Sequence, residues 1–263
     1  MDRADQGRPA SDRPASDQPA SDRPAPGLAV TVVGCDGSWV GPGGAGSCYL
    51  VRTPGSTLVL DCGPGAFGRL QLAVDPASVT AVLVSHHHPD HWTDLHALAT
   101  HARLALDRQV DVYAPAELPE RTGLGREAAL RWHPLADGDR VDVGEASCTF
   151  RRTEHAPVTL AVRVEAGGRV FGYSADSGPG WSLAELGSDL DLALCEATYT
   201  CEHEGTADHM SGRQAGAQAR RAGAARLMVT HRWPTVAASA VASEAAVAFG
   251  GPVEQAVVGR TVV

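Results

Sequence analysis

The sequence predicts a layered α/β domain, in which helices pack against a core built from strands. Short β-branched and apolar runs, such as Val79–Ser85 and Leu190–Cys195, are typical of buried strands. Segments with the apolar spacing of amphipathic helices, such as Thr93–Leu106, alternate with these runs along the chain. After a polar N-terminal stretch roughly 235 residues remain, which suits one domain. The alternation and the length together favour a single layered α/β unit.

The N-terminal stretch, residues 1–26, differs from the rest in composition. Residues 8–25 repeat a five-residue unit and read RPASD-RPASD-QPASD-RPA. Such a segment lacks the apolar surface that would offset the entropy lost on ordering. We therefore expect a disordered tail, with a docking segment as the alternative, and a folded domain over residues 27–263.

Strands and helices are expected in a definite order within that domain. The strand-like runs are Leu28–Gly34, Cys48–Val51, Thr57–Asp61, Val79–Ser85, Cys148–Glu154, Leu160–Glu165, Arg169–Ser174, Leu190–Cys195 and Arg226–Thr230. The helical segments are Pro64–Val74, Thr93–Leu106, a segment between Ser211 and Gly223, and Val236–Phe249. The stretch between Leu106 and Cys148 is expected to be rich in loops.

Local signals set some of these boundaries. Ser211 and Gln214 have the spacing of a capping box, which predicts a helix start. Thr93 is the expected N-cap of the helix over Thr93–Leu106. Gly167-Gly168 predicts a hairpin turn between two strands.

Charge and composition exclude some classes of function. The chain has 22 basic residues, all of them arginine, against 31 acidic ones, and its formal net charge is −9. This balance argues against binding a long nucleic acid, and no lysine is available as a Schiff base, nucleophile or phosphate clamp. No apolar run approaches the ~18 residues of a membrane span, and the N-terminus has no signal-peptide character. We therefore expect a cytoplasmic protein that does not bind a membrane.

The segment after the strand that ends at Ser85 carries the clearest functional signal, and it reads His86-His87-His88-Pro89-Asp90-His91. His86 and His88 are two residues apart, so an extended or turning backbone can bring both imidazoles to one metal. Pro89 disfavours a helical conformation at His88 and keeps this loop open. Asp90 and His91 follow at an expected helix start and can face a second metal.

Imidazole and carboxylate donors suit Zn²⁺, Mn²⁺ and Fe. Four donors within six residues exceed what one tetrahedral site with an open position requires. We therefore expect two divalent metal ions ~3.5–4 Å apart, with Zn²⁺ as the first choice and Mn²⁺ or Fe as alternatives. A solvated histidine-rich loop is the structural alternative.

This segment resembles the signature of the metallo-β-lactamase superfamily, which is His-x-His-x-Asp-His after a core strand. The resemblance covers nearly all of residues 28–263 and implies a four-layer αββα sandwich and a metal-dependent hydrolase. In that family the strand before the motif ends in an aspartate-glycine element, matched here by Leu60-Asp61-Cys62-Gly63. The resemblance implies that Asp61 orients the histidine-rich loop from behind the ligands.

The resemblance also implies three further ligands, a histidine, an aspartate and a histidine, which match His155, Asp176 and His231. Each follows an expected strand. One metal would then bind His86, His88 and His155, and the other Asp90, His91 and His231. Asp176 would bridge the two ions.

Two further segments resemble loops of the RNase Z-like phosphodiesterases, and they are Leu194–Tyr199 and Asp208–Ser211. The resemblance implies that His209 assists phosphoryl chemistry and that Glu196 orients the His209 ring. The catalytic candidates are therefore Asp90, Glu196 and His209. Cys195 replaces the first histidine of the family's His-Glu-Ala-Thr loop. The alternative is that Glu196 merely ends a strand and His209 merely precedes a helix.

The region near the start of the domain is less specific. Val33–Ser38 and the glycine-rich Gly41–Ser47 resemble that branch, in which this part lies near the substrate. Glycine amides there could approach a phosphate, but a flexible connection explains the pattern equally well. Trp39 and Trp233 are more typical of packing residues, although either could stack on a base.

The substrate prediction rests on what separates His155 from Asp176. Only twenty residues lie between them, which is room for a hairpin and not for the long arm of the tRNA 3′-end endonucleases in this branch. With the acidic charge, this favours a small phosphodiester as the partner molecule. The whole-length pattern, including the ending Thr230–Pro234, resembles actinobacterial phosphodiesterases that act on cyclic nucleotides.

The sequence thus predicts a dinuclear metal-dependent phosphodiesterase that hydrolyses cyclic nucleotides or other small phosphodiesters through a metal-bridging hydroxide. The resemblance further suggests a homodimer. A thioester or lactam hydrolase of the same fold, similar to glyoxalase II, and a tRNA 3′-endonuclease without its arm remain alternatives. A protein that uses the metals only for structure or ligand binding is a third class.

Overall fold

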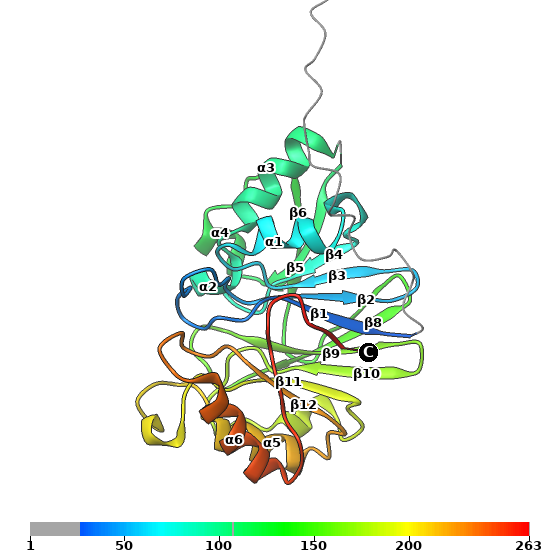
Figure 1. Cartoon of the computed structure of the whole chain (residues 1–263). Helices are drawn as coiled ribbons and strands as arrows, with labels where there is room; N and C mark the ends of the chain where they lie inside the picture. Colours follow the sequence, from blue (N-terminus) through cyan, green and yellow to red (C-terminus); the bar gives the residue numbers. More distant parts are fainter. Residues whose placement is uncertain (1–26, 107, 263) are drawn as a thin grey trace, which may run out of the picture.

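Two mixed β-sheets form the centre of the molecule (Figure 1). The computed structural model describes residues 27–106 and 108–262, so the expected N-terminal tail lies outside the described residues. Across the first sheet the strands are β14 (Thr261–Val262), β1 (Ala29–Gly34), β2 (Cys48–Arg52), β3 (Thr57–Leu60), β4 (Ala81–Leu83), β5 (Val110–Pro115) and β6 (Leu130–Leu135). Across the second they are β13 (Glu254–Gln255), β12 (Leu227–Thr230), β11 (Leu192–Glu196), β10 (Arg169–Tyr173), β9 (Leu160–Ala166), β8 (Ala146–Arg152) and β7 (Arg140–Val143).

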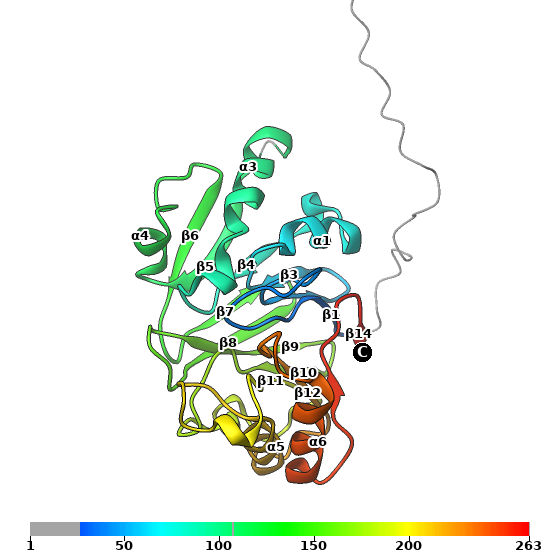
Figure 2. The same cartoon turned by 60° about the vertical axis from the view of Figure 1, so that its left-hand side comes forward.

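Helices cover the outer faces of both sheets (Figure 2). The first sheet carries α1 (Ala66–Ala73), α2 (Pro89–Trp92), α3 (Leu95–Ala105) and α4 (Leu118–Thr122), and the second carries α5 (Gly212–Arg221) and α6 (Ala238–Phe249). Short 3₁₀ turns lie at Pro76–Ser78, Leu183–Leu186 and Cys201–His203. Within the described ranges, no helix combines the length and the apolar character that crossing a membrane demands.

Three apolar clusters hold these layers together. The cluster between the sheets includes Leu60 from the first and Phe171 from the second. A second cluster joins the first sheet to its helices, for example Val82 to Leu98, and a third joins the second sheet to α5 and α6. Each layer therefore buries apolar surface on the side that faces its neighbour. This arrangement confirms the expected four-layer αββα sandwich.

Because several strands are paired in parallel, their carboxyl ends lie at the same edge of each sheet. In the first sheet β3 and β4 run parallel, and in the second β10, β11 and β12 do. The carboxyl ends of parallel strands lie at the same edge of a sheet, and the loops that follow them can share one site. Asp61 and His86 follow β3 and β4, Glu196 ends β11, and Asp176 and His231 follow β10 and β12.

Several local expectations are confirmed. Ser211 caps α5 with the full capping box, in which its side chain accepts from the Gln214 amide. Gly167 and Gly168 have φ values of 55° and 73° and form the turn between β9 and β10, a conformation that glycine adopts without strain. Gly223 follows the end of α5 with a φ of 68°.

Two expectations are wrong. The stretch between Leu106 and Cys148 is not mainly loop, because it contains β5, α4, β6 and β7. Strand β5 alternates buried and partly exposed side chains over most of its length, and β6 and β7 are largely exposed or half-buried, so all three lack the continuous apolar runs of central strands. Thr93 does not cap α3, because Thr93 is the C-cap of the preceding one-turn helix α2 and Asp94 is the N-cap of α3. The Asp94 carboxylate instead accepts a hydrogen bond from the Phe67 amide of α1 at 2.8 Å.

Glu145 ties the β7–β8 turn of the second sheet to the β2–β3 turn of the first. Its carboxylate accepts hydrogen bonds from Thr53 Oγ1 at 2.5 Å, Gly55 N at 2.6 Å and Ser56 Oγ at 2.9 Å. The Thr53 hydroxyl, helped by the Gly55 amide, lowers the pKa of Glu145 to about 2. The ionised carboxylate is therefore the form that holds the two turns together.

Replacing Glu145 with glutamine should lower the free energy of unfolding at pH 7 by about 1 kcal/mol, a small value because solvent screens this exposed group. Since folding lowers the pKa from 4.5, the carboxylate contributes fully above pH 4.5, and its contribution is lost as the pH falls to about 2. Urea unfolding should show the difference between the two proteins shrinking over that interval. Glu120→Gln, on α4, is the matched control, and a Glu145→Gln difference independent of pH would contradict this account.

Candidate metal centre

The structure brings all seven expected ligands together at the strand ends, and we call these residues the His/Asp cluster. Four follow β4, one lies between β8 and β9, one follows β10 and one follows β12: His86, His88, Asp90, His91, His155, Asp176 and His231. Their donor atoms form two groups, within each of which all atoms lie within 4.8 Å of one another. The groups are His86, His88, His155 and Asp176, and Asp90, His91 and His231; a third group within the same distance joins His209, which is not one of the seven, to Asp176 and His231. Residues far apart in the chain thus converge on one place.

The first group surrounds one oxygen of Asp176. His88 Nδ1 lies 3.2 Å from His155 Nε2. Asp176 Oδ2 lies 3.5 Å from His86 Nε2 and 3.8 Å from His155 Nε2. Three imidazole nitrogens and a carboxylate oxygen therefore point toward a common centre, as a tetrahedral or five-coordinate ion requires.

The second group faces the other oxygen of the same carboxylate. Asp90 Oδ2 lies 3.1 Å from His231 Nε2 and 3.5 Å from His91 Nε2. Asp176 Oδ1 lies 3.2 Å from His91 Nε2 and 3.3 Å from His231 Nε2. Asp176 thus presents one oxygen to each group, which is the geometry of a bridging ligand.

Neighbouring groups fix the orientation of four of the imidazoles. The ring nitrogen that faces away from the centre contacts Asp61 Oδ2 at 2.8 Å in His91 and Ser85 Oγ at 3.0 Å in His86. In His231 the corresponding contact is Thr198 Oγ1 at 3.0 Å, and in His155 it is the Asp208 carbonyl at 3.0 Å. These contacts leave the inward nitrogen of each ring free to donate its lone pair to a cation.

The centre of the His/Asp cluster contains buried polar atoms that lack a hydrogen-bond partner. They are His86 Nε2, His91 Nε2 and Asp176 Oδ1. Buried polar atoms are nearly always paired in folded proteins. Cations bound between these three atoms would supply the partners that they lack. A pair of divalent ions therefore fits the residues that are present.

The electrostatics of the His/Asp cluster agree with this fit. Burial and the neighbouring His155 lower the pKa of His88 to about 4, so its ring is neutral at pH 7 and available as a donor. Burial also lowers the pKa of His91, but three carboxylates, led by Asp176 and Asp90, outweigh it and raise that pKa above the ordinary value. The concentration of negative charge around one imidazole favours cations at this place.

The backbone is strained where it carries the site. Among the described residues, the non-glycine residues with positive φ are Ser38 (62°), Asp61 (59°), Ala175 (51°) and His231 (55°). All four belong to the His/Asp cluster, adjoin it in sequence or hydrogen-bond to it. Such conformations cost of order 1–3 kcal/mol each and collect at functional sites.

A second pair of residues lies beside the His/Asp cluster. Glu196 is buried at the end of β11, and its Oε1 lies 3.0 Å from His209 Nδ1. The same carboxylate accepts from the Ser177 amide at 2.7 Å and the Thr198 hydroxyl at 2.8 Å, so it is rigidly held. Burial opposes protonation of His209, but the charge and hydrogen bond of Glu196 raise its pKa to about 9. The His209 ring centroid is 5.1 Å from that of His155.

The glycine-rich loop is a packed connection and not an open cradle for an anion. The Gly41 amide of this loop donates to Asp36 Oδ2 at 2.9 Å, and in the segment Val33–Ser38 just before it the Ser38 amide donates to Asp90 Oδ2 at 2.7 Å. A Cβ atom at Gly37 would lie 2.3 Å from the carbonyl oxygen of His231. The close approach of the segment Val33–Ser38 to the His/Asp cluster therefore requires glycine at position 37.

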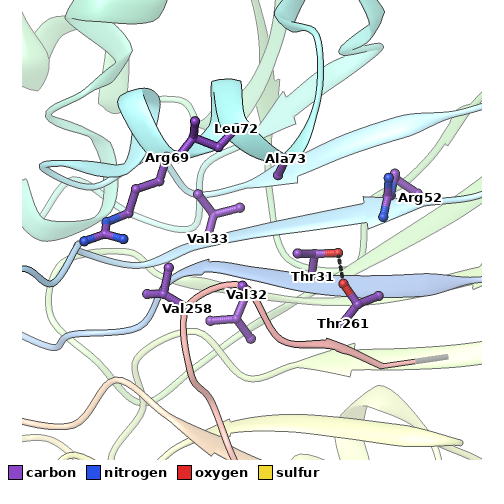
Figure 3. A pocket seen from close by; sticks show the side chains of 10 residues that line it. Thr31, Val32, Val33, Arg52, Arg69, Leu72, Ala73, Val258 and Thr261 are labelled. Atoms are coloured by element: carbon purple, nitrogen blue, oxygen red, sulfur yellow. Dashed lines mark hydrogen bonds between the residues drawn. The ribbon is translucent and has the colours of Figure 1, made fainter. Parts of the chain in front are cut away.

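A groove far from this chemistry lies between α1 and the C-terminal segment (Figure 3). It has a volume of about 230 Å³ and is lined by apolar side chains, among them Val33, Leu72 and Val258. The hydrogen bond between Thr31 and Thr261 at 2.8 Å lies at its edge and joins β1 to β14. The groove contains none of the candidate catalytic residues.

Comparison with known proteins agrees with this geometry. A family model described as a β-lactamase superfamily domain matches residues 56–232. The crystal structure of the metallo-β-lactamase fold protein YhfI from Bacillus subtilis superposes with a TM-score of 0.85 at 27% identity, covering 90% of this chain and 99% of that one. The chain belongs to the metallo-β-lactamase superfamily. It is therefore a hydrolase, and its fold implies that it binds divalent metal.

Relatives place the chain near the RNase Z-like members of the superfamily. An uncharacterized protein of Mycobacterium tuberculosis is 36% identical over an alignment of 250 residues that covers 89% of this chain and 91% of that protein. The ribonuclease Z of Mycobacterium marinum is 28% identical over 270 residues, covering 86% of this chain and 95% of that enzyme. The family resemblance expected from the histidine motif is thus confirmed.

The sequence alone did not predict most of the groups that hydrogen-bond to the His/Asp cluster and hold its side chains in place. Ser85, Thr198 and the Asp208 carbonyl orient histidines of the His/Asp cluster, and the Ser38 amide binds Asp90. Small hydroxyl residues and backbone groups carry no sequence signal of such a role. Asp61 was expected to orient the histidine-rich loop, and it accepts from the Ser85 amide at 2.7 Å as well as contacting His91.

Replacing Asp61 with asparagine should weaken metal binding about 10–100-fold, because the neutral amide no longer holds the proton of His91 on Nδ1. A competition titration with a metallochromic chelator measures the affinity. Tyr173→Phe is the matched control, since it removes the hydroxyl that donates to Asp61 Oδ2 at 2.8 Å and leaves the carboxylate next to His91. Equal losses of affinity in both variants would contradict a specific role for the carboxylate.

Proposed function

We propose that this protein is a dinuclear metal-dependent phosphodiesterase that hydrolyses small phosphodiesters, cyclic nucleotides in particular. In this proposal the seven residues of the His/Asp cluster hold the ions, and Asp90, Glu196 and His209 take part in the chemistry. The Glu196–His209 pair beside the cluster carries the proposal. An additional imidazole with its own buried carboxylate suits a reaction in which a poor leaving oxygen needs a proton.

The position of His209 supports its role as a proton donor. Its Nδ1 is held by Glu196, which leaves Nε2 as the atom that can reach a substrate. The ring lies between the two metal groups, with centroids 5.1 Å from His155 and 5.2 Å from His231. A phosphate at the ions would therefore lie next to this imidazole.

The reaction can be written with these residues. Two divalent ions, when bound, supply Lewis-acid activation of water and offset charge on the phosphate. The oxygen of a water molecule forms a bond to phosphorus, and the bond from phosphorus to the leaving ester oxygen breaks. Burial raises the pKa of the Asp90 carboxyl, but His91 and His231 outweigh this and hold that pKa well below its usual range. Asp90 therefore orients the attacking water, the proton that the water loses passes to solvent, and His209 gives a proton to the leaving oxygen. Glu196 stabilises the protonated ring of His209 and fixes its orientation.

The surroundings of the site favour a small substrate. A depression of about 700 Å³ beside His155 is lined by Glu154 and Asp208, both exposed. Their negative charge disfavours a long polyanion at this rim. Between His155 and Asp176 the chain forms only the β9–β10 hairpin, so this connection has no protruding element that could grip an RNA.

The ion we propose is Zn²⁺, because five imidazoles dominate the donor set. Mn²⁺ and Fe share this donor set, and elemental analysis of the purified protein distinguishes the three. The homodimer suggested by the family resemblance stays a prediction, which the mass in solution checks.

A turnover screen tests the proposed function. We expect the metal-loaded protein to hydrolyse bis-p-nitrophenyl phosphate and 3′,5′- or 2′,3′-cyclic nucleotides, to lose this activity with a chelator, and to act poorly on short RNA. Fully loaded protein that leaves every phosphodiester intact would overturn the proposal. Turnover of a thioester such as S-lactoylglutathione by that same sample would support the glyoxalase II-like alternative.

A further inference from the structure

Two tryptophans stand beside the proposed active site. Trp39 is 44% exposed, whereas the other exposed large apolar side chains of the described residues are aliphatic: Leu72, Leu104, Val247 and Val257. Its ring lies 5.8 Å from that of Trp233, with 34° between the ring planes. Packing within the protein explains only the buried part of this indole ring. Exposed aromatic rings are typical of binding sites.

The position of this pair is fixed relative to the His/Asp cluster. The Ser38 amide donates to Asp90 Oδ2 at 2.7 Å, and the Ser38 hydroxyl accepts from Trp233 Nε1 at 3.0 Å. Ser38 itself has a φ of 62°, a strained conformation in the residue next to Trp39. Trp233 also follows the ligand His231 by two residues.

A second set of contacts joins the pair to His209. The Trp233 ring lies 5.5 Å from that of Tyr199, and the Tyr199 hydroxyl donates to the His209 carbonyl at 2.7 Å. The tryptophan pair is thus connected to a proposed metal ligand on one side and to the proposed proton donor on the other. Each connection passes through a single intervening residue, Ser38 or Tyr199.

From this placement we infer that Trp39, backed by Trp233, is the surface on which the substrate stacks an aromatic ring, so that the favoured phosphodiesters carry a nucleobase. This inference rests on the proposed phosphodiesterase function and narrows its substrate class. Stacking requires only a flat ring face, which every base offers, so we expect discrimination between substrates with and without a base and little discrimination among bases. No lysine is needed for this, since the phosphate is bound at the other end of the substrate.

The test compares kcat/KM for 3′,5′-cyclic AMP with kcat/KM for ribose 3′,5′-cyclic phosphate, which lacks the base. Trp39→Ala should lower the ratio of kcat/KM for cyclic AMP to kcat/KM for the ribose compound about tenfold, because one stacked base contributes that order of affinity. The change should appear in the KM for cyclic AMP. Trp39→Phe should retain part of the ratio. Leu72→Ala, which removes an exposed apolar side chain in the groove of Figure 3, should leave the ratio unchanged.

The outcomes separate this inference from the function on which it rests. If Trp39→Ala lowers both rates equally, the stacking role is overturned and the phosphodiesterase stands. If the wild-type protein hydrolyses neither compound, calorimetry on the metal-loaded protein decides the matter. Trp39→Ala should then weaken binding of AMP about tenfold more than binding of ribose 5-phosphate, and equal weakening of both would overturn the inference.

Discussion

Replacing Asp176 with alanine should lower kcat/KM for a cyclic nucleotide by about 10³-fold or more, since the ions supply several kcal/mol of charge stabilisation. The same variant should bind fewer than two ions. The reason is geometric, because Asp176 presents Oδ2 to one group of ligands and Oδ1 to the other. Steady-state kinetics together with elemental analysis of the dialysed protein measure both effects.

The matched control changes an aspartate that is remote from the ligands. Asp189 binds Arg163 at the surface, with Oδ1 2.7 Å from Nη1, and Asp189→Ala should keep the activity and the metal content of the wild type. An Asp176→Ala protein that retains two ions and activity within tenfold of wild type would remove the bridging role. Circular dichroism establishes that the variants compared are folded.

Replacing His209 with alanine should lower kcat for cyclic AMP about 10²–10⁴-fold, the usual contribution of a positioned acid. Metal content should stay at the wild-type level, because His209 binds Glu196 through Nδ1 and is not among the seven proposed ligands. The combination of lost turnover and retained metal distinguishes a proton donor from a ligand.

The leaving group supplies a sharper readout for the same variant. The p-nitrophenolate of bis-p-nitrophenyl phosphate departs without a proton, so His209→Ala should lose far less activity on this compound than on cyclic AMP. His96→Ala, on the exposed face of α3, is the control and should behave as wild type on both. Equal losses on the two substrates would argue against proton donation, and unchanged turnover would favour a thioester or lactam hydrolase.

The layered α/β architecture and the histidine-rich motif could be predicted from patterns that are local in the chain, whereas the four-layer sandwich and the three distant ligand candidates were implied by the resemblance to the metallo-β-lactamase superfamily. His86 to His91 form a dense motif after a buried strand, and His155, Asp176 and His231 follow strands that are themselves recognisable. The parallel pairing of β10, β11 and β12 then brings distant residues to one edge without further information.

What the sequence could not predict depends on three-dimensional packing. The strands between Leu106 and Cys148 are half exposed, so their apolar pattern is weak. The start of α3 lies after Asp94 because the preceding residues Pro89–Trp92 form the separate one-turn helix α2. Ser38 illustrates the same limit, since only the folded chain reveals that its amide binds Asp90.

The origin of the ligands in two different sheets has a consequence for stability. His86, His88, Asp90 and His91 follow β4 of the first sheet, whereas His155, Asp176 and His231 are carried by connections of the second. Any ion held by both sets of residues links the two sheets of the sandwich. Its binding free energy then contributes to the stability of their packing against each other. Binding of the proposed metal ions and association of the two sheets are therefore thermodynamically linked, so that a change in one changes the other.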